Sequence, residues 1–123
     1  MRIVQGVVVI VAMHVAGIGD LTAQTAKIAG LGAARCDVFT ADTEQTPAMH
    51  RDYFAWAQGF MSGVLISQPP DVDDGVDLVP HSLPLVQQVE WLRQYCRANP
   101  GQDFTDAVLS LYKRLRQGES VRR

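Results

Sequence analysis

Two cysteines and two histidines in the body of the chain are the first residues to consider as reactive groups. Cys36 or Cys96 beside His50 or His81 would supply a thiol nucleophile and its general base. Neither cysteine lies in the signature of a cysteine enzyme, and each thiol can be consumed by the other. The spacing also lacks the paired CxxC or HxxxH ligands of a zinc site. We therefore expect no catalytic residue and no metal at these positions.

A second candidate for chemistry is an acidic, proline-rich segment at residues 67–82. Counted from Asp71, glycine falls at position 5 and Ser82 at position 12, whereas the EF-hand calcium loop needs glycine at 6 and glutamate at 12. We therefore predict an extended, solvated loop without metal, and we expect it to contribute to a partner-binding surface. The carboxylates that we assign to this surface are those of Asp71, Asp73, Asp74 and Asp77.

Other patterns typical of catalysis do not occur in the sequence. It has no glycine-rich phosphate loop, no serine-nucleophile motif and no pair of carboxylates within an apolar helix. The sequence thus predicts a protein that is not an enzyme and that needs no cofactor.

The first 23 residues have the features of a secretion signal. Met1-Arg2 is a minimal basic n-region, residues 3–18 form an uncharged apolar run, and residues 19–23 are the small, polar exit where a signal peptidase cuts. The run is shorter than the about 20 apolar residues that a membrane-spanning helix needs. We expect a signal peptide at residues 1–23, a mature domain at residues 24–123, no stable membrane span and a periplasmic location.

Export would change how the charges and the cysteines are interpreted. Once Arg2 and Asp20 leave with the signal, 12 acidic and 10 basic residues remain, so no basic field is left to bind nucleic acid. In an oxidising compartment, two isolated cysteines in a domain of about 100 residues are expected to form one disulfide. Cys36 and Cys96 are 60 residues apart, and closing such a loop stabilises a fold by roughly 4 kcal/mol.

Apolar residues recur at helical spacing in three segments after the first cysteine. The predicted buried faces are Met49, Tyr53, Trp56, Phe60 and Val64; Leu85, Val89, Leu92 and Cys96; and Phe104, Val108, Leu111 and Leu115. Residues 36–39 are expected to form a helical turn, and residues 41–46 a polar connection. Gly59 and Gly63 predict a flat patch that another helix approaches. The fold class is therefore all-α, a small domain of three to four helices with one disulfide, preceded by a cleavable signal peptide.

The residues at the ends of these segments predict where each helix begins. Thr46 and Pro47 suit the start of the first helix, and Ser82 suits the N-cap of the second. Asp103 and Asp106 form an acidic first turn in the third helix, where negative charge favours the helix dipole.

Two aromatic residues fall beside the predicted core faces. A domain of this size cannot bury every large ring, so we expect Phe54 or Trp91 to contribute to an exposed apolar patch. Such a patch marks a surface that binds a partner.

Short motifs between residues 36 and 115 resemble a known family. Residues 95–100, Tyr-Cys-Arg-Ala-Asn-Pro, are similar to the Tyr-Cys-basic-x-Asn-Pro segment of the periplasmic acid-stress chaperones of the HdeA and HdeB family. Further matches are Cys36 with Phe39, Gly59 with Phe60, and Cys96 with Phe104, Asp106 and Val108. The resemblance implies a helical protein that is a dormant homodimer when folded. Acid then weakens its self-association and frees apolar surface for unfolded clients in the stress response.

A second resemblance implies another function. Residues 56–63 and 92–115 are similar to the Tai group of periplasmic immunity proteins, which block amidase toxins of type VI secretion. That likeness implies tight binding of one folded toxin at neutral pH. Both resemblances imply a protein partner, either unfolded clients or a toxin.

Overall fold

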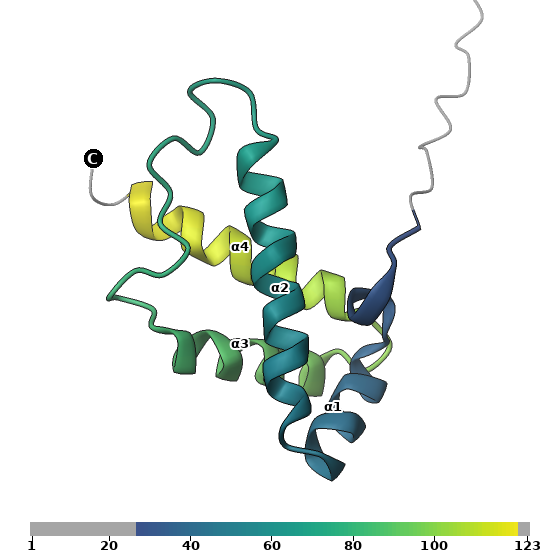
Figure 1. Cartoon of the computed structure of the whole chain (residues 1–123). Helices are drawn as coiled ribbons and strands as arrows, with labels where there is room; N and C mark the ends of the chain where they lie inside the picture. The colour runs from purple at the N-terminus through teal and green to yellow at the C-terminus, as the bar shows by residue number, and fades with distance from the viewer. Residues whose placement is uncertain (1–26, 121–123) are drawn as a thin grey trace, which may run out of the picture.

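Residues 27–120 are the part of the chain that the structure, a computed structural model, describes, and they fold into four α-helices and one short 3-10 helix (Figure 1). The elements are η1 (Gly30–Ala33), α1 (Cys36–Gln45), α2 (Met49–Ile66), α3 (Leu85–Ala98) and α4 (Phe104–Ser120). The predicted all-α class is therefore confirmed. The predicted signal peptide at residues 1–23 lies outside the described residues.

The helices pack around a central pair formed by α3 and α4. Helix α2 crosses this pair and packs on α4, while α1 packs on α3 and α2 at one end of the molecule (Figure 1). Residues 67–84 connect α2 to α3 by a long path that passes the C-terminal part of α4, and we call this connection the acidic loop (Figure 1).

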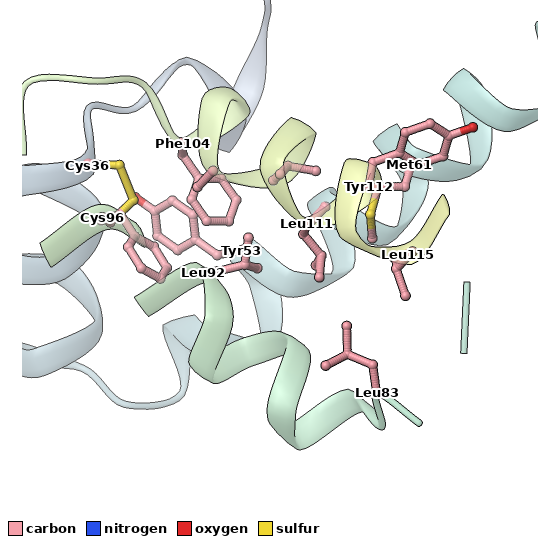
Figure 2. Packing of buried hydrophobic residues seen from close by; sticks show 14 residues of the cluster. Cys36, Tyr53, Met61, Leu83, Leu92, Cys96, Phe104, Leu111, Tyr112 and Leu115 are labelled. Atoms are coloured by element: carbon pink, nitrogen blue, oxygen red, sulfur yellow. A yellow bond between two sulfur atoms is a disulfide. The ribbon is translucent and has the colours of Figure 1, made fainter. Parts of the chain in front are cut away.

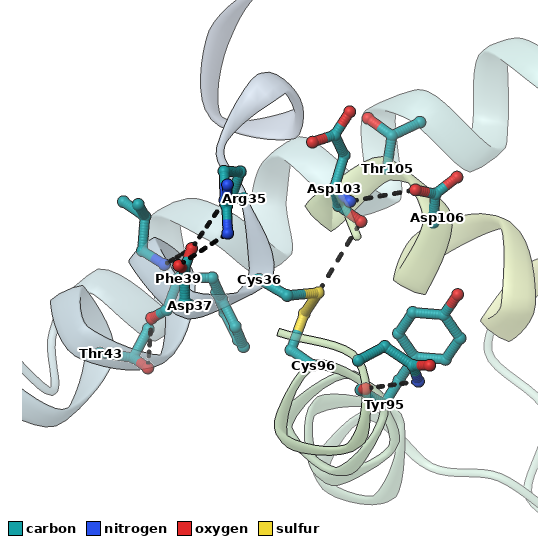
Figure 3. The surroundings of a disulfide bond; sticks show 12 residues. Arg35, Cys36, Asp37, Phe39, Thr43, Tyr95, Cys96, Asp103, Thr105 and Asp106 are labelled. Carbon is teal, nitrogen blue, oxygen red and sulfur yellow. Dashed lines mark hydrogen bonds and ion pairs between the residues drawn. A yellow bond between two sulfur atoms is a disulfide. The ribbon is translucent and has the colours of Figure 1, made fainter. Parts of the chain in front are cut away.

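The Cys36–Cys96 disulfide closes the end of the fold that carries α1, with the two Cα atoms 4.7 Å apart (Figure 3). It joins the first residue of α1 to the last turn of α3, and both cysteines are fully buried. Backbone hydrogen bonds close the same junction: the Cys36 N–H donates to the Gln102 carbonyl, and the Phe104 N–H donates to the Ala34 carbonyl, both at 2.8 Å. The predicted disulfide is confirmed, and it tethers the N-terminal segment to the end of α3 as expected.

The core differs in character between its two ends (Figure 2). Beside the disulfide, the rings of Phe39, Tyr53 and Phe104 contact one another with centroid separations of 4.7 to 5.0 Å. Away from the disulfide the buried side chains belong to Met61, Leu83, Tyr112 and Leu115. The disulfide thus reinforces the aromatic end, whereas the other end lies nearer to the acidic loop.

Helix α1 is longer than predicted, because it continues through residues 41–45. Phe39 and Thr43 are both buried on one face of α1, and the Thr43 hydroxyl donates to the Phe39 carbonyl at 2.8 Å. That bond satisfies a polar side chain inside the core, so a segment that looks like a polar turn in the sequence forms a buried helix face.

Two of the predicted helix starts are also wrong. Thr46 follows the end of α1, and α2 begins at Met49 after a tight turn in which the Met49 N–H donates to the Thr46 carbonyl at 2.9 Å. Pro84, not Ser82, directly precedes α3, because its fixed φ suits that position. The acidic first turn of α4 is confirmed, since the Asp106 carboxylate accepts from the Asp103 N–H at 3.0 Å.

The predicted buried face is confirmed for α4 and only in part for α2 and α3. Phe104, Val108, Leu111 and Leu115 are all buried. Of the positions predicted for α2 and α3, Tyr53, Leu92 and Cys96 are buried, whereas the other buried positions of these helices are Ala57, Met61 and Gln88. Trp56 is half-buried, and its ring packs on Gly32 of η1 so closely that a Cβ would have no room there.

The predicted approach of a helix to Gly59 and Gly63 is wrong for the part of the chain that the structure describes. Both glycines are exposed, and no atom of another element lies within 4 Å of where a Cβ would stand.

Candidate functional site

The acidic loop is fastened to α4 at its centre by Asp73. Its Oδ2 accepts from the Tyr112 hydroxyl at 2.7 Å, and its Oδ1 accepts from the Arg116 Nε–H at 2.6 Å. The Asp73 side chain is only 7% exposed, whereas that of Arg116 is 48% exposed. The predicted solvated loop therefore has one carboxylate that is not solvated. The other three remain exposed: Asp71, Asp74 and Asp77.

The local backbone explains how Asp73 reaches α4. Asp71, Asp73 and Gly75 have positive φ angles of 68°, 57° and 78°, so the chain reverses direction repeatedly over five residues. Aspartate and glycine tolerate this left-handed conformation better than other residues. The Val76 N–H also donates to the Asp73 carbonyl at 3.1 Å and closes a turn at the fastening point.

The Tyr112 hydroxyl is strongly affected by its position under the loop. Burial, followed by the hydrogen bond to Asp73 and the charge of Asp73, raises the pKa of Tyr112 to about 12, although Arg116 acts in the opposite direction. The protonated phenol is therefore the form that the folded protein prefers, because it donates to a carboxylate.

A second fastening holds the other half of the loop. Gln88 of α3 is completely buried, and its Nε2 donates to the carbonyls of Leu78 and Leu83, each at 2.9 Å. Gln88 was not among the predicted buried residues because it is polar. Its spacing of four and eight residues before Leu92 and Cys96 is the signal that could have placed it on the buried face.

Beneath these fastenings lies the end of the core away from the disulfide. Tyr112, which touches Asp73, is buried, as are Met61 and Leu115 at the same end (Figure 2). A loop that left α4 at Asp73 would open the Tyr112 side of this end of the core to solvent or to a partner.

Several apolar side chains are exposed in the folded protein, close in sequence to the ends of the loop. Ile66 at the end of α2 is 85% exposed. Around the start of α3, Val86 is 82% exposed, Val79 is 55% exposed and Leu85 is also exposed. We refer to these last three residues, which lie around the start of α3 in the sequence, as the α3 patch. Val86 also lines an open depression together with Val89 and Arg93 among others.

Phe54 and Trp91, either of which was expected to contribute to an exposed apolar patch, are both half-buried. Both Phe54 and Trp91 pack against the core cluster. The Trp91 Nε1–H also donates to the Ser110 hydroxyl of α4 at 3.2 Å, so this ring joins α3 to α4.

Neither cysteine carries a free thiol that could pair with an imidazole, because Cys36 and Cys96 form the predicted disulfide. His50 lies edge-on to the Phe39 ring with the centroids 5.9 Å apart. Burial and then the nearby Arg93 lower the pKa of His50, which Glu90 partly offsets. Within residues 27–120, no group of three or more histidine, cysteine or acidic side chains is arranged to hold a metal ion.

A similar carboxylate fastening joins α1 to α2, where the Tyr53 hydroxyl donates to Asp42 at 2.7 Å. Burial, then the bond to Asp42, raises the pKa of Tyr53.

Among the described residues, no helix has both the length and the apolar character needed to cross a bilayer.

Comparison with protein-family models, with curated proteins and with solved structures found no match for this chain. The fold and the site therefore define its class. It is a small, disulfide-bonded helical domain whose acidic loop is fastened over the apolar end of the core.

Proposed function

We propose that this chain is an exported, non-enzymatic protein-binding domain that binds unfolded periplasmic clients under acid stress. The observation that carries this proposal is the Asp73 fastening. Acid protonates carboxylates, and a neutral carboxylic acid no longer forms an ion pair. Acid would therefore remove the charge that holds the loop against Tyr112 and Arg116.

The charge balance of the whole domain supports the same direction of change. Protonation of its carboxylates leaves the lysine, arginine and histidine side chains positive, so a slightly acidic domain becomes strongly cationic. Self-repulsion then loosens a compact or dimeric state. Many acidic proteins share this effect. In this protein the buried Asp73 holds one particular loop, so that loop is where we expect acid to loosen the structure.

The disulfide supports a limited response to acid rather than complete unfolding. Exchange of a disulfide needs an attacking thiolate, which is scarce at low pH, so the Cys36–Cys96 bond persists there. We expect the aromatic end of the core to stay closed while the loop end opens.

The test is suppression of client aggregation. Malate dehydrogenase, as an unrelated client, is denatured at pH 3 with and without the oxidised protein, and light scattering is followed there and after neutralisation. We expect protection at pH 3, release of the client on return to pH 7, and no protection at pH 7. An equal concentration of an unrelated small protein is the control. Absence of protection at pH 3 would rule out the proposal.

A second function is favoured by one specific observation, the exposure of the α3 patch in the folded protein. Val86 and its neighbours would be available to a folded partner at neutral pH without any opening of the loop. This suits an immunity protein that neutralises an amidase toxin of type VI secretion. Val86→Ser would then weaken a nanomolar toxin complex at least tenfold. Ile66→Ser, an equally exposed apolar position on α2, is the matched control and should leave the complex unchanged.

A further inference from the structure

The acidic loop is held by two fastenings of different chemistry, at Asp73 and at Gln88. We infer that acid opens only residues 68–77, while residues 78–84 stay docked and serve as a hinge. The assignment of the opened surface to clients rests on the proposed function. The two-stage opening itself does not.

The first fastening depends on charge throughout. Asp73 faces Tyr112 and Arg116 of α4. No charged residue lies in the last two turns of α2 or in the first turn of α3, which are the other elements that the loop joins. Acid therefore weakens this half of the loop, because its attachment to α4 is an ion pair and a charge-assisted hydrogen bond. The loop's own titrating groups are Asp71, Asp73, Asp74, Asp77 and His81.

The second fastening does not depend on pH. The Gln88 carboxamide does not titrate, and its two bonds to Leu78 and Leu83 join neutral groups. Leu83 and Pro80 are buried, so apolar packing adds to the attachment of this half. The boundary between the opening and the docked halves of the loop lies beside Val79, whose N–H donates to the Asp77 carboxylate at 2.8 Å.

The environment of Gln88 shows that its donor bonds matter. Its Oε1 is buried without a hydrogen-bond partner among the described residues. A buried acceptor left unpaired costs about 1 to 3 kcal/mol, so an amide is a costly choice at this position unless its two N–H bonds are needed. Those two bonds are the ones that hold the loop.

Partial opening defines the surface that becomes available. Release of residues 68–77 removes Asp73 from Tyr112, which lies at the same end of the core as Met61 and Leu115, while Leu83 remains in the core. A strip of this kind suits one extended apolar segment of a partly unfolded protein. The docked half keeps the loop in register, so neutralisation can restore the Asp73 fastening and displace the segment.

Methyl NMR of the oxidised protein, titrated from pH 7 to pH 2, tests the inference. We expect the Val76 methyl shifts to move to random-coil values with a midpoint at least one pH unit above that of Leu83. The Leu111 methyls report that the core remains folded. A single midpoint shared by Val76 and Leu83, or loss of Leu83 first, would overturn the inference.

Two variants separate the fastenings at neutral pH. Asp73→Asn should shift the Val76 signals at pH 7 and leave those of Leu83 unchanged, and Asp71→Asn in the same loop should change neither. Gln88→Met, which keeps the volume but removes the donors, should release Leu83 at every pH. Gln88→Leu, which also lacks a donor and does not titrate, is the alternative if Gln88→Met does not fold. An unchanged Leu83 in the folded variant contradicts the hinge. These NMR measurements contain no client protein. If the loop opens in two stages but the aggregation assay shows no protection, only the proposed function is ruled out.

Discussion

Replacing Asp73 with asparagine is the most informative single change in this protein. The side chain keeps its shape and an acceptor oxygen for the Tyr112 hydroxyl, but it loses the charge that pairs with Arg116. Asparagine also tolerates the left-handed φ of 57° at this position, so no backbone strain is introduced. The variant therefore isolates the charge of the fastening.

The size of the effect follows from the exposure of the two partners. An exposed ion pair contributes up to about 1 kcal/mol, whereas a hydrogen bond to a buried charged group contributes about 1.5 to 3 kcal/mol. Because Asp73 is 7% exposed and Arg116 is 48% exposed, the pair lies between these cases. We expect Asp73→Asn to lower the free energy of unfolding at pH 7 by about 1 to 2 kcal/mol, which corresponds to a decrease in Tm of roughly 4 to 16 °C.

Urea denaturation followed by tryptophan fluorescence, repeated at each unit from pH 7 to pH 2, measures this difference. Strong acid protonates carboxylates and removes the charge that distinguishes the two proteins, so the variant and the wild type should converge at the acid end of this range. Asp71→Asn removes one charge from the same loop at an exposed site and should change stability by less than about 0.5 kcal/mol. A destabilisation that stays constant with pH, or one equal to that of Asp71→Asn, would refute the reasoning.

Three further predictions concern other groups of the fold. The pKa of His50 is lowered in the folded state, so the unfolded chain binds the proton first and stability decreases as the pH falls below about 6.5. His50→Gln should therefore reduce the dependence of the free energy of unfolding on pH between pH 7 and pH 5, as measured by urea denaturation. An equal dependence on pH in the variant and the wild type would contradict this. The pKa of Tyr112 is raised to about 12, so the stability that its protonated hydroxyl contributes is present below about pH 10 and lost as the pH rises through 12. Tyr112→Phe should lose less stability than the wild type over that range, as measured by circular dichroism. Replacing Cys36 and Cys96 together with serine should cost roughly 4 kcal/mol in urea denaturation, and stability equal to that of the oxidised protein would argue against the disulfide's role.

The parts of the fold that local patterns encode were predictable. The α4 face was found because its apolar residues repeat every three to four positions, and the disulfide followed from there being two cysteines in a small domain. Helix α1 was largely missed because its buried Thr43 satisfies its hydroxyl within the helix, which makes a core position look like a turn.

The site was harder to predict than the fold. Asp73 was recognised as part of an acidic loop, but its partner Tyr112 lies 39 residues away, and no local pattern links the two. From the sequence alone the four carboxylates of the loop cannot be distinguished, and the tertiary fold buries one of them. Gln88 was missed for a related reason, because its partners are backbone carbonyls in the preceding loop and leave no mark on side-chain composition.

The central claim is that neutralising Asp73 makes apolar surface available to clients. The most direct measurement is the pH dependence of client light scattering, compared for the wild type, Asp73→Asn and Asp71→Asn with the disulfide intact. We expect Asp73→Asn to protect malate dehydrogenase from aggregation at a higher pH than the wild type, with Asp71→Asn matching the wild type. Coincident profiles for all three proteins, or no protection at any pH together with a nanomolar complex with a folded amidase toxin at neutral pH, would contradict the account.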